Sequence, residues 1–408
     1  MMKIIDGGVT APKGFMAAGT QAAIKYENRP DMAMVYSQKP CIVAGTFTSN
    51  VVKAAPVLWD MKIVKENGTA RAAVVNTGIA NAGTGKEGMD ICRTEAEEAA
   101  KVLGVLREEV LVGSTGVIGE QLDALKLKAG IKALASKLSD SRQAANEASV
   151  AIMTTDTVNK EAAVTFEIGG RTVTVGGMSK GSGMIHPNMC TMLGYITTDI
   201  DIDRALLQKA LSEDVKDTFN MITVDGDTST NDTLLLFANG LAGNEKITSE
   251  NEDYKKFCEA LHYVNETLAK KMAGDGEGAT KLVEVCVRGA TSKESAKILA
   301  RSVAGSNLTK AAMYGNDSNF GRILCALGYS GVSFDPDRVD ISYEAEGKTI
   351  NIFSGGIKSD YDEEEATKLL DHKEVRIIAD MHEGSAEATA WGCDLTYDYV
   401  KINADYRS

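Results

Sequence analysis

A glycine-rich run in the middle of the chain carries the residues best suited to chemistry. It extends from Gly176 to Thr191, reads GGMSKGSGMIHPNMCT, and is followed by the apolar stretch Met192–Ile196. A cut before Thr191 would free a threonine with a new α-amino group. A threonine hydroxyl is a weak nucleophile without a base, and an α-amino group with a reference pKa of about 7.7–8 is such a base near neutral pH. The run therefore predicts a cut between Cys190 and Thr191 and a threonine nucleophile.

Four further segments are polar, and three of them are rich in glycine. Any one of them alone is best explained as a turn or a helix cap. Together with the central run, they favour a functional site. Backbone N–H groups of a turn at Thr115 and Gly116 would suit an oxyanion hole, worth about 3–4 kcal/mol per donor in acyl transfer. The four segments are Asn76–Gly85, Gly113–Gly119, Met153–Thr157 and Asp275–Lys281.

Two partial motifs, for phosphate and for calcium, fail on their residues. Glu87 stands where a hydroxyl residue should follow Lys86 of a phosphate loop. Thr230 replaces the turn glycine of a calcium loop that would begin at Asp225. The four histidines have no metal-ligand spacing, so we expect no metal site.

The composition is that of a soluble globular protein. The 408 residues suffice for one large domain or two lobes, and 44% are hydrophobic and 25% charged. A net charge of -13 disfavours nucleic acid as a partner. No apolar run approaches the ~18 residues of a membrane span, and no secretory leader is recognisable. With seven scattered cysteines and no Cys-x-x-Cys, we expect a cytoplasmic protein with reduced thiols.

Strand-like and helix-like segments alternate along the chain, which predicts an α+β (mixed α/β) fold rather than an all-parallel sheet. Gly169-Gly170 predicts a hairpin turn, and capping boxes predict helix starts at Ser249 and Thr291. The segment Gly176–Asn188 is the predicted lobe boundary. Helices are predicted at Met89–Glu109, Leu122–Met153 and Arg204–Asn220. Strands are predicted at Cys41–Thr48, Ala72–Asn76, Val110–Val112, Val164–Ile168, Thr172–Val175, Thr233–Ala238 and Leu282–Arg288, with strand pairs Asp340–Glu344/Thr349–Phe353 and Val375–Ala379/Thr389–Leu395.

These motifs resemble the ornithine acetyltransferase family, also called glutamate N-acetyltransferase, of arginine biosynthesis. The resemblance runs essentially from end to end, and the central motif is long enough to be highly specific. It is carried by NTGIANAGTG, STGVIG, MTTDT, GMSKGSGMIHPNMCTML, DGEGATK, AMYGNDSNFGRI and INADYRS.

The resemblance implies a precursor that cuts itself before Thr191, so that residues 1–190 become an α chain and residues 191–408 a β chain. The two chains would stay together as an α2β2 heterotetramer. The implied fold has layered α/β/β/α lobes similar to DmpA-like and N-terminal-nucleophile enzymes. Thr191 would take the acetyl group of N-acetylornithine and pass it to glutamate in a ping-pong cycle.

The resemblance also implies roles for single residues. Thr115 and Gly116 match the oxyanion-hole pair of the family. The positions that match substrate contacts are Thr154, Lys180, Thr191, Glu277, Asn403 and Ser408. Lys180 suits a substrate carboxylate, and Glu277 suits the amines of ornithine or proton relay.

Two positions depart from the family pattern. Cys190 stands before the cut, where alanine or glycine is more usual, and Ser408 replaces the commoner threonine. The cysteine raises a rival mechanism in which Cys190 and His186 form a catalytic pair in an uncut chain. Such a pair needs a third group to orient it, and the sequence identifies none.

Other functions remain open at this stage. A related N-terminal-nucleophile aminopeptidase or amidase would share the cut and the acyl-threonine but pass the acyl group to water. A non-catalytic amino-acid-binding protein would keep the fold with a dead site. We expect no resident cofactor, and no motif decides whether acetyl-CoA serves as a second acetyl donor.

Overall fold

The computed structural model describes residues 2–186 and 192–405, and these form two compact units. Unit 1 comprises Met1–Gly181, Asn188–Phe219 and Thr228–Leu268. Unit 2 comprises Ser182–Pro187, Asn220–Asp227 and Ala269–Ser408. The first passage from unit 1 to unit 2, after Gly181, lies within the predicted boundary segment. The units do not follow the division into residues 1–190 and 191–408, which describes a cut in the chain and stays a prediction.

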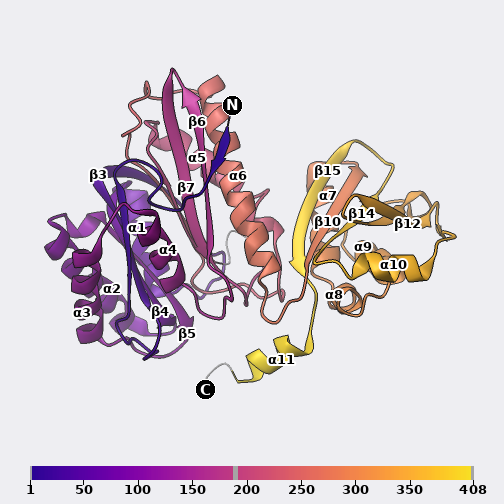
Figure 1. Ribbon diagram of the computed structural model, residues 1–408, viewed down its shortest axis with the longest axis horizontal. Coiled ribbons are helices and arrows are strands. Elements are labelled where there is room, and N and C mark those ends of the chain that lie inside the picture. Colours follow the sequence, from indigo (N-terminus) through magenta and orange to yellow (C-terminus); the bar gives the residue numbers. More distant parts are fainter. Residues whose placement is uncertain (1, 187–191, 406–408) are drawn as a thin grey trace. The chain divides into compact units, whose positions relative to one another are not determined.

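Unit 1 contains a nine-stranded sheet and six helices among the described residues (Figure 1). Its strands are β1 (Lys3–Ile5), β2 (Phe15–Thr20), β3 (Met32–Phe47), β4 (Thr69–Ile79), β5 (Val110–Val117), β6 (Lys160–Ile168), β7 (Arg171–Lys180), β8 (Leu193–Thr198) and β9 (Thr233–Ala238). Its helices are α1 (Ala55–Glu66), α2 (Gly85–Leu103), α3 (Ala124–Lys137), α4 (Arg142–Ala151), α5 (Arg204–Asp214) and most of α6 (Glu252–Gly274).

The long strand β3 belongs to both halves of this sheet. The strand order is β1-β6-β7-β8-β9-β3-β4-β5, and β2 also pairs with β3. The register between β3 and β4 shifts between Tyr36 and Cys41. Pro40 lies in this interval and has no N–H to donate to the ladder, which accounts for a break in the pairing there.

The sheet folds back on itself at β3. In a flat sheet β8 and β5, which are four strands apart, would be separated by about 19 Å. Yet a Cβ atom built on Gly113 of β5 would lie 2.2 Å from the hydroxyl of Tyr195 on β8. The two halves therefore pack face to face, and Val35, Val75 and Leu235 belong to the core between them.

Helices cover the outer faces of the two halves. Alternate residues such as Met34 on β3 and Val74 on β4 point away from the inner core and pack with α2 and α3. On the other half, the place of a Gly177 side chain is taken by Ile196 and by Val264 and Leu268 of α6. Unit 1 thus has the α/β/β/α layering expected from the sequence, and the mixed α/β class is confirmed.

Unit 2 contains a six-stranded mixed sheet of order β13-β12-β11-β14-β10-β15. The helix α7 packs on β10 and β15, and α10 packs on β11. Its strands are β10 (Leu282–Ala290), β11 (Asp340–Ala345), β12 (Lys348–Ser354), β13 (Ile357–Lys358), β14 (Glu374–Asp380) and β15 (Ala386–Cys393). Its own helices are α7 (Lys293–Ala304), α8 (Asn307–Tyr314), α9 (Phe320–Gly328), α10 (Glu363–Leu370) and α11 (Tyr397–Ala404).

Most predicted strands are confirmed, whereas several helix boundaries were wrong. The Gly169-Gly170 hairpin joins β6 and β7, and both glycines have positive φ, +54° and +74°. The helix predicted for Leu122–Met153 is two helices, because Ser141 accepts a hydrogen bond from the Ala144 N–H and starts α4 anew.

Other corrections concern helix ends and one strand pair. The helices predicted for Met89–Glu109 and Arg204–Asn220 end early, at Leu103 and Asp214, and the first is closed by the left-handed Gly104. The side chains of Asn251 and Ser292, not Ser249 and Thr291, accept the capping hydrogen bonds of α6 and α7. The strands β14 and β15 do not pair, because β10 lies between them. No described helix is long and apolar enough to cross a membrane.

The topology of unit 1 predicts the behaviour of a cut chain. A cut before Thr191 would leave β8 and β9 on the second fragment, although both lie between β7 and β3 of the first fragment. Six residue pairs, from Val175↔Thr198 to Lys180↔Leu193, join β7 to β8. We predict that the two fragments co-elute on size exclusion in native buffer and separate only in denaturant. Elution as two separate species without denaturant would contradict this sheet order.

Candidate active site

The side chain of Lys180 is the centre of a polar cluster in unit 1. Lys180 is the last residue of β7, is buried, and pairs with Leu193, the first residue of β8. Its ammonium donates a hydrogen bond of 2.7 Å to the Thr154 hydroxyl and a longer one of 3.5 Å to the Thr115 hydroxyl. The structure thus brings together three predicted site residues from β5, β7 and the segment that follows α4.

The carboxylate of Asp156 lies near the Lys180 ammonium, and the Asp156 side chain is fully buried. One carboxylate oxygen accepts hydrogen bonds from the Lys160 ammonium and the Gly181 N–H, both at 2.7 Å. The other accepts from the Thr154 N–H at 3.0 Å and lies 3.8 Å from the Lys180 ammonium. Burial acts to raise the pKa of Asp156, but the charges of Lys180 and Lys160 outweigh it and hold this pKa well below its usual range. The carboxylate is therefore ionised across the physiological range.

Thr115 and Gly116 lie in β5, so the predicted turn at this point is wrong. The reason is that β5 continues its parallel pairing with β4 as far as Val117. Gly116 nevertheless has a positive φ of +131°. A Cβ atom at this position would lie 2.2 Å from the carbonyl carbon of Gly78 on β4, so only glycine fits.

Buried amide side chains fix the ends of β4 and β5. The Ser114 hydroxyl donates to Asn76 Oδ1 at 2.7 Å, and Asn76 Nδ2 donates to the Ile79 carbonyl at 2.9 Å. Asn231, which precedes β9, donates to the Ser114 carbonyl at 2.8 Å. These contacts hold Thr115 from both halves of the folded sheet.

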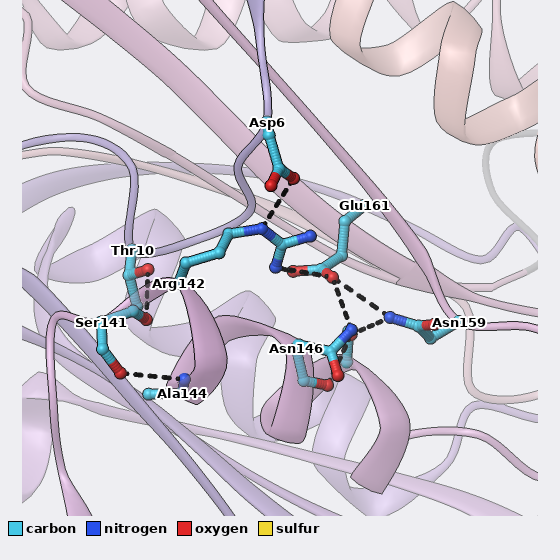
Figure 2. A network of polar contacts seen from close by, with 9 residues as sticks. Asp6, Thr10, Ser141, Arg142, Ala144, Asn146, Asn159 and Glu161 are labelled. Carbon is cyan, nitrogen blue, oxygen red and sulfur yellow. Dashed lines mark hydrogen bonds and ion pairs between the residues drawn. The ribbon is translucent and has the colours of Figure 1, made fainter.

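A second network holds α4, which leads into Thr154 (Figure 2). The buried carboxylate of Glu161 accepts hydrogen bonds from Arg142 at 2.9 and 3.0 Å, from Asn159 at 3.1 Å and from Asn146 at 3.2 Å. Arg142 also bonds Asp6 at 2.8 Å. These bonds connect the first residue and the middle of α4 to Glu161 of β6 and so restrict where Thr154 can lie.

Two further predicted residues meet in unit 2. Glu277 is buried, and its carboxylate accepts a hydrogen bond of 2.7 Å from Asn403 Nδ2 of α11. The Glu277 N–H donates to the Ser182 carbonyl at 2.8 Å. A Cβ atom on Gly183 would lie 2.4 Å from the Glu277 carboxylate, so a larger residue there would displace the carboxylate. The glycines near this glutamate therefore allow close approach of backbone and carboxylate.

The surroundings of His186 disfavour the cysteine–histidine mechanism. The guanidinium of Arg301 can only donate, so its 3.0 Å contact makes Nε2 of His186 the acceptor. The opposite nitrogen, Nδ1, lies 3.0 Å from the Thr223 hydroxyl, which itself donates to the Ile185 carbonyl. Burial and then the charge of Arg301 lower the pKa of His186. Both ring nitrogens are thus engaged within unit 2, and the ring is held neutral.

Three predicted site residues, Cys190, Thr191 and Ser408, lie outside the described residues. Within the described part of the chain, no group of three or more His, Cys, Asp or Glu side chains is placed to hold a metal ion.

Sequence reasoning missed Asp156, the charged partner of Lys180, and Lys160, which binds the same carboxylate. Asp156 stands inside the hydroxyl-rich MTTDT motif, and Lys160 follows it by four residues as the first residue of β6. A lysine usually lies in a solvated position, but Lys160 is fully buried.

Comparison with known proteins assigns the chain to a family. The model of the ArgJ family matches residues 16–408. An arginine biosynthesis bifunctional protein ArgJ 1 from Clostridium acetobutylicum is 53% identical over 408 residues, which cover 100% of this chain and 99% of that protein. The chain belongs to the ArgJ family. The family expected from the sequence motifs is therefore confirmed.

Other ArgJ proteins support the same assignment. An arginine biosynthesis bifunctional protein ArgJ from Symbiobacterium thermophilum is 52% identical over 409 residues, with 100% of both chains covered. The crystal structure of an ArgJ protein from Bacillus halodurans is 48% identical with a TM-score of 0.50, and the match covers 97% of that chain but 52% of this one.

The geometry at Gly116 yields a prediction with a matched control. We expect Gly116→Ala to lower the free energy of unfolding by about 3 kcal/mol or more, because it combines a positive φ with a clash against backbone. Gly119 also has a positive φ, +88°, but nothing lies within 4 Å of a Cβ there. Gly119→Ala should cost only about 1–2 kcal/mol. Urea denaturation of both variants measures the difference, and equal losses would contradict the close contact with Gly78.

Proposed function

We propose that this ArgJ-family chain is an acetyltransferase that moves an acetyl group from N-acetylornithine to glutamate. The proposal follows the curated relatives, which are named arginine biosynthesis bifunctional proteins. It specifies a self-cleaving precursor, a threonine nucleophile and a ping-pong cycle in the cytoplasm.

The observation that carries the proposal is the position of the Lys180 ammonium. Lys180 ends β7 and pairs with Leu193, which is two residues after Thr191 in the chain. The ammonium is buried and bonded to the hydroxyls of Thr154 and Thr115. A buried cation beside hydroxyl groups suits an anionic amino-acid substrate, because the low local dielectric strengthens its attraction to a carboxylate.

The proposed chemistry balances in each half-reaction. The Thr191 hydroxyl attacks the acetyl carbonyl carbon, and its proton passes to the α-amino group that the cut creates. The C–N bond then breaks, the proton moves to the departing amine, and ornithine leaves an acetyl-threonine ester. The amine of glutamate attacks the ester carbonyl carbon and loses a proton to the same base. The bond between the acetyl carbon and the threonine oxygen then breaks, N-acetylglutamate leaves, and the base returns the proton to the Thr191 oxygen.

Thr115 and Gly116 are proposed to stabilise the oxyanion of each tetrahedral intermediate. Preorganised donors of this kind are worth about 2.7–4 kcal/mol each. The fixed backbone of Gly116 and the anchored end of β5 meet the requirement that such donors do not reorganise during the reaction.

Substrate recognition is proposed to use one cation, one carboxylate and hydroxyl groups. Lys180 would bind a substrate carboxylate, with Thr154 contributing its hydroxyl. Glu277 would bind the amine end of ornithine or move its proton, with Asn403 orienting the carboxylate. Ser408 is proposed as a further substrate contact by its match to the family motif.

The length of the crystallised relative supports the proposed cut. The Bacillus halodurans chain is matched over nearly all of its own length but spans about half of this chain. Residues 191–408 are likewise a little over half of this chain. A separate chain of a cut precursor would give such a match. The α and β chains are proposed to assemble as an α2β2 heterotetramer.

Acetyl-CoA is proposed as a second acetyl donor, in line with the bifunctional naming of the relatives. In that reaction the thioester carbonyl would replace the amide of N-acetylornithine and CoA would leave as a thiol. No resident cofactor is part of the proposal.

Self-cleavage is tested by a pair of neighbouring variants. We expect the wild type to give two fragments on a denaturing gel, with the second starting TMLGY, and Thr191→Ala to give one uncut chain without transfer activity. Cys190→Ala should still be cut and still transfer acetyl, because alanine is usual in the family at this position. A fully active, uncut wild type would refute the proposed mechanism. Release of acetate without transfer to glutamate would instead identify a hydrolase.

A further inference from the structure

The cluster Lys160–Asp156–Lys180 places two ammonium groups on one buried carboxylate. We propose that Lys160 is a positioning residue that keeps the Lys180 ammonium directed at the threonine hydroxyls instead of at Asp156. The inference rests on the proposed function, in which Lys180 binds the carboxylate of the substrate.

The distances divide the two lysines by role. The Lys160 ammonium lies 2.7 Å from Asp156 Oδ1, whereas the Lys180 ammonium lies 3.8 Å from Oδ2. The shortest of these Lys180 contacts is the one to the Thr154 hydroxyl, at 2.7 Å. Lys160 thus makes the tight ion contact, and Lys180 makes the tight contact on the side of Thr154.

The backbone holds Lys160 in this role. It is the first residue of β6 and pairs with Ser179, the residue before Lys180 on β7. Its ammonium also donates to the Val158 carbonyl at 3.1 Å. The Lys160 and Asp156 side chains are both 0% exposed, so their geometry is set by packing and not by solvent.

Stability alone gives little reason for this lysine. Burying a lysine and an aspartate removes two charges from water, and such pairs are often neutral or unfavourable compared with apolar residues. A function for the pair explains its presence better. Asp156 orders the Thr154 and Gly181 N–H groups, and Lys160 supplies the countercharge that Lys180 would otherwise have to supply.

Removing the charge of Lys160 should therefore act through Lys180. In Lys160→Met, Asp156 loses the positive charge of Lys160, so its attraction for the Lys180 ammonium is no longer offset. The Lys180 ammonium should then move toward the Asp156 carboxylate. Its hold on a substrate carboxylate should weaken. Asp156→Asn in the same chain removes the attracting charge. The net charge of positions 156 and 160 together is then zero, as in the wild type.

The test compares Lys160→Met, the double variant Lys160→Met/Asp156→Asn, and a matched control. Lys348 is also the first residue of a strand and also forms an ion pair, 2.9 Å from Glu365, but this pair is exposed. Lys348→Met should behave as the wild type. We expect Lys160→Met to raise KM for N-acetylornithine about tenfold with kcat nearly unchanged, the signature of lost binding. The double variant should recover part of this loss, because the asparagine lacks the attracting charge but can accept only one of the two backbone N–H groups that the carboxylate binds.

Kinetics are measured on the fully cut fraction, so that a maturation defect is not counted as a binding defect. Wild-type KM in cut Lys160→Met would overturn the proposal. If the methionine variants do not fold, the pair Lys160→Gln with and without Asp156→Asn gives the same comparison with a polar side chain. A wild type that releases no ornithine would refute the proposed function itself, which is a different result from an active enzyme insensitive to Lys160.

Discussion

The bend of β3 is the constraint on which the site in unit 1 depends. β3 pairs with β4 in one half of the sheet and with β9 in the other, with a shift in register around Pro40. Because the two halves fold together, β5 and β7 bring Thr115 and Lys180 within hydrogen-bond distance, although they are five strands apart in the sheet order. A flat sheet of the same order would keep these residues far apart.

The folded sheet buries a cluster of charged side chains. Lys160 and Lys180 are both arranged around the carboxylate of Asp156. Asp156 accepts hydrogen bonds from two backbone N–H groups and contacts two lysines, and these contacts hold a segment without regular structure in place. Its low pKa reflects those lysines and persists despite burial. In unit 2, Glu277 is held in a comparable way by Asn403 and by the backbone of Ser182. In both units a buried acid is oriented before any substrate binds.

Local patterns in the sequence predicted most of the strands, because alternation and turn residues are signals within a few residues. The grouping of Thr115, Thr154 and Lys180 in one site was instead implied by the resemblance to the family motifs. Local patterns did not predict the break between α3 and α4. There the backbone of Leu138 leaves the helical conformation and Ser139 pairs with Ala17 of β2, a contact between distant parts of the chain. The buried state of Lys160 was also beyond local patterns, because it depends on partners brought by the pairing of β6 with β7.

The positive φ at Gly116 shows the same limit. The motif STGVIG indicated a turn, but the parallel partner β4 keeps the residues in a strand. Gly116 has no side chain and so leaves room for the backbone of Gly78. This contact joins segments that are nearly forty residues apart in the chain. Sequence motifs thus located the chemistry, whereas the reasons for single residues came from long-range packing.

The central claim is that Thr191 carries the acetyl group between the two substrates. Denaturing mass spectrometry after incubation with N-acetylornithine, without glutamate, tests it most directly. We expect one added acetyl group on the fragment that begins at Thr191, located on that first residue, and its loss when glutamate is added. An acetyl group on Cys190, or full transfer activity with no acetylated fragment, would contradict it.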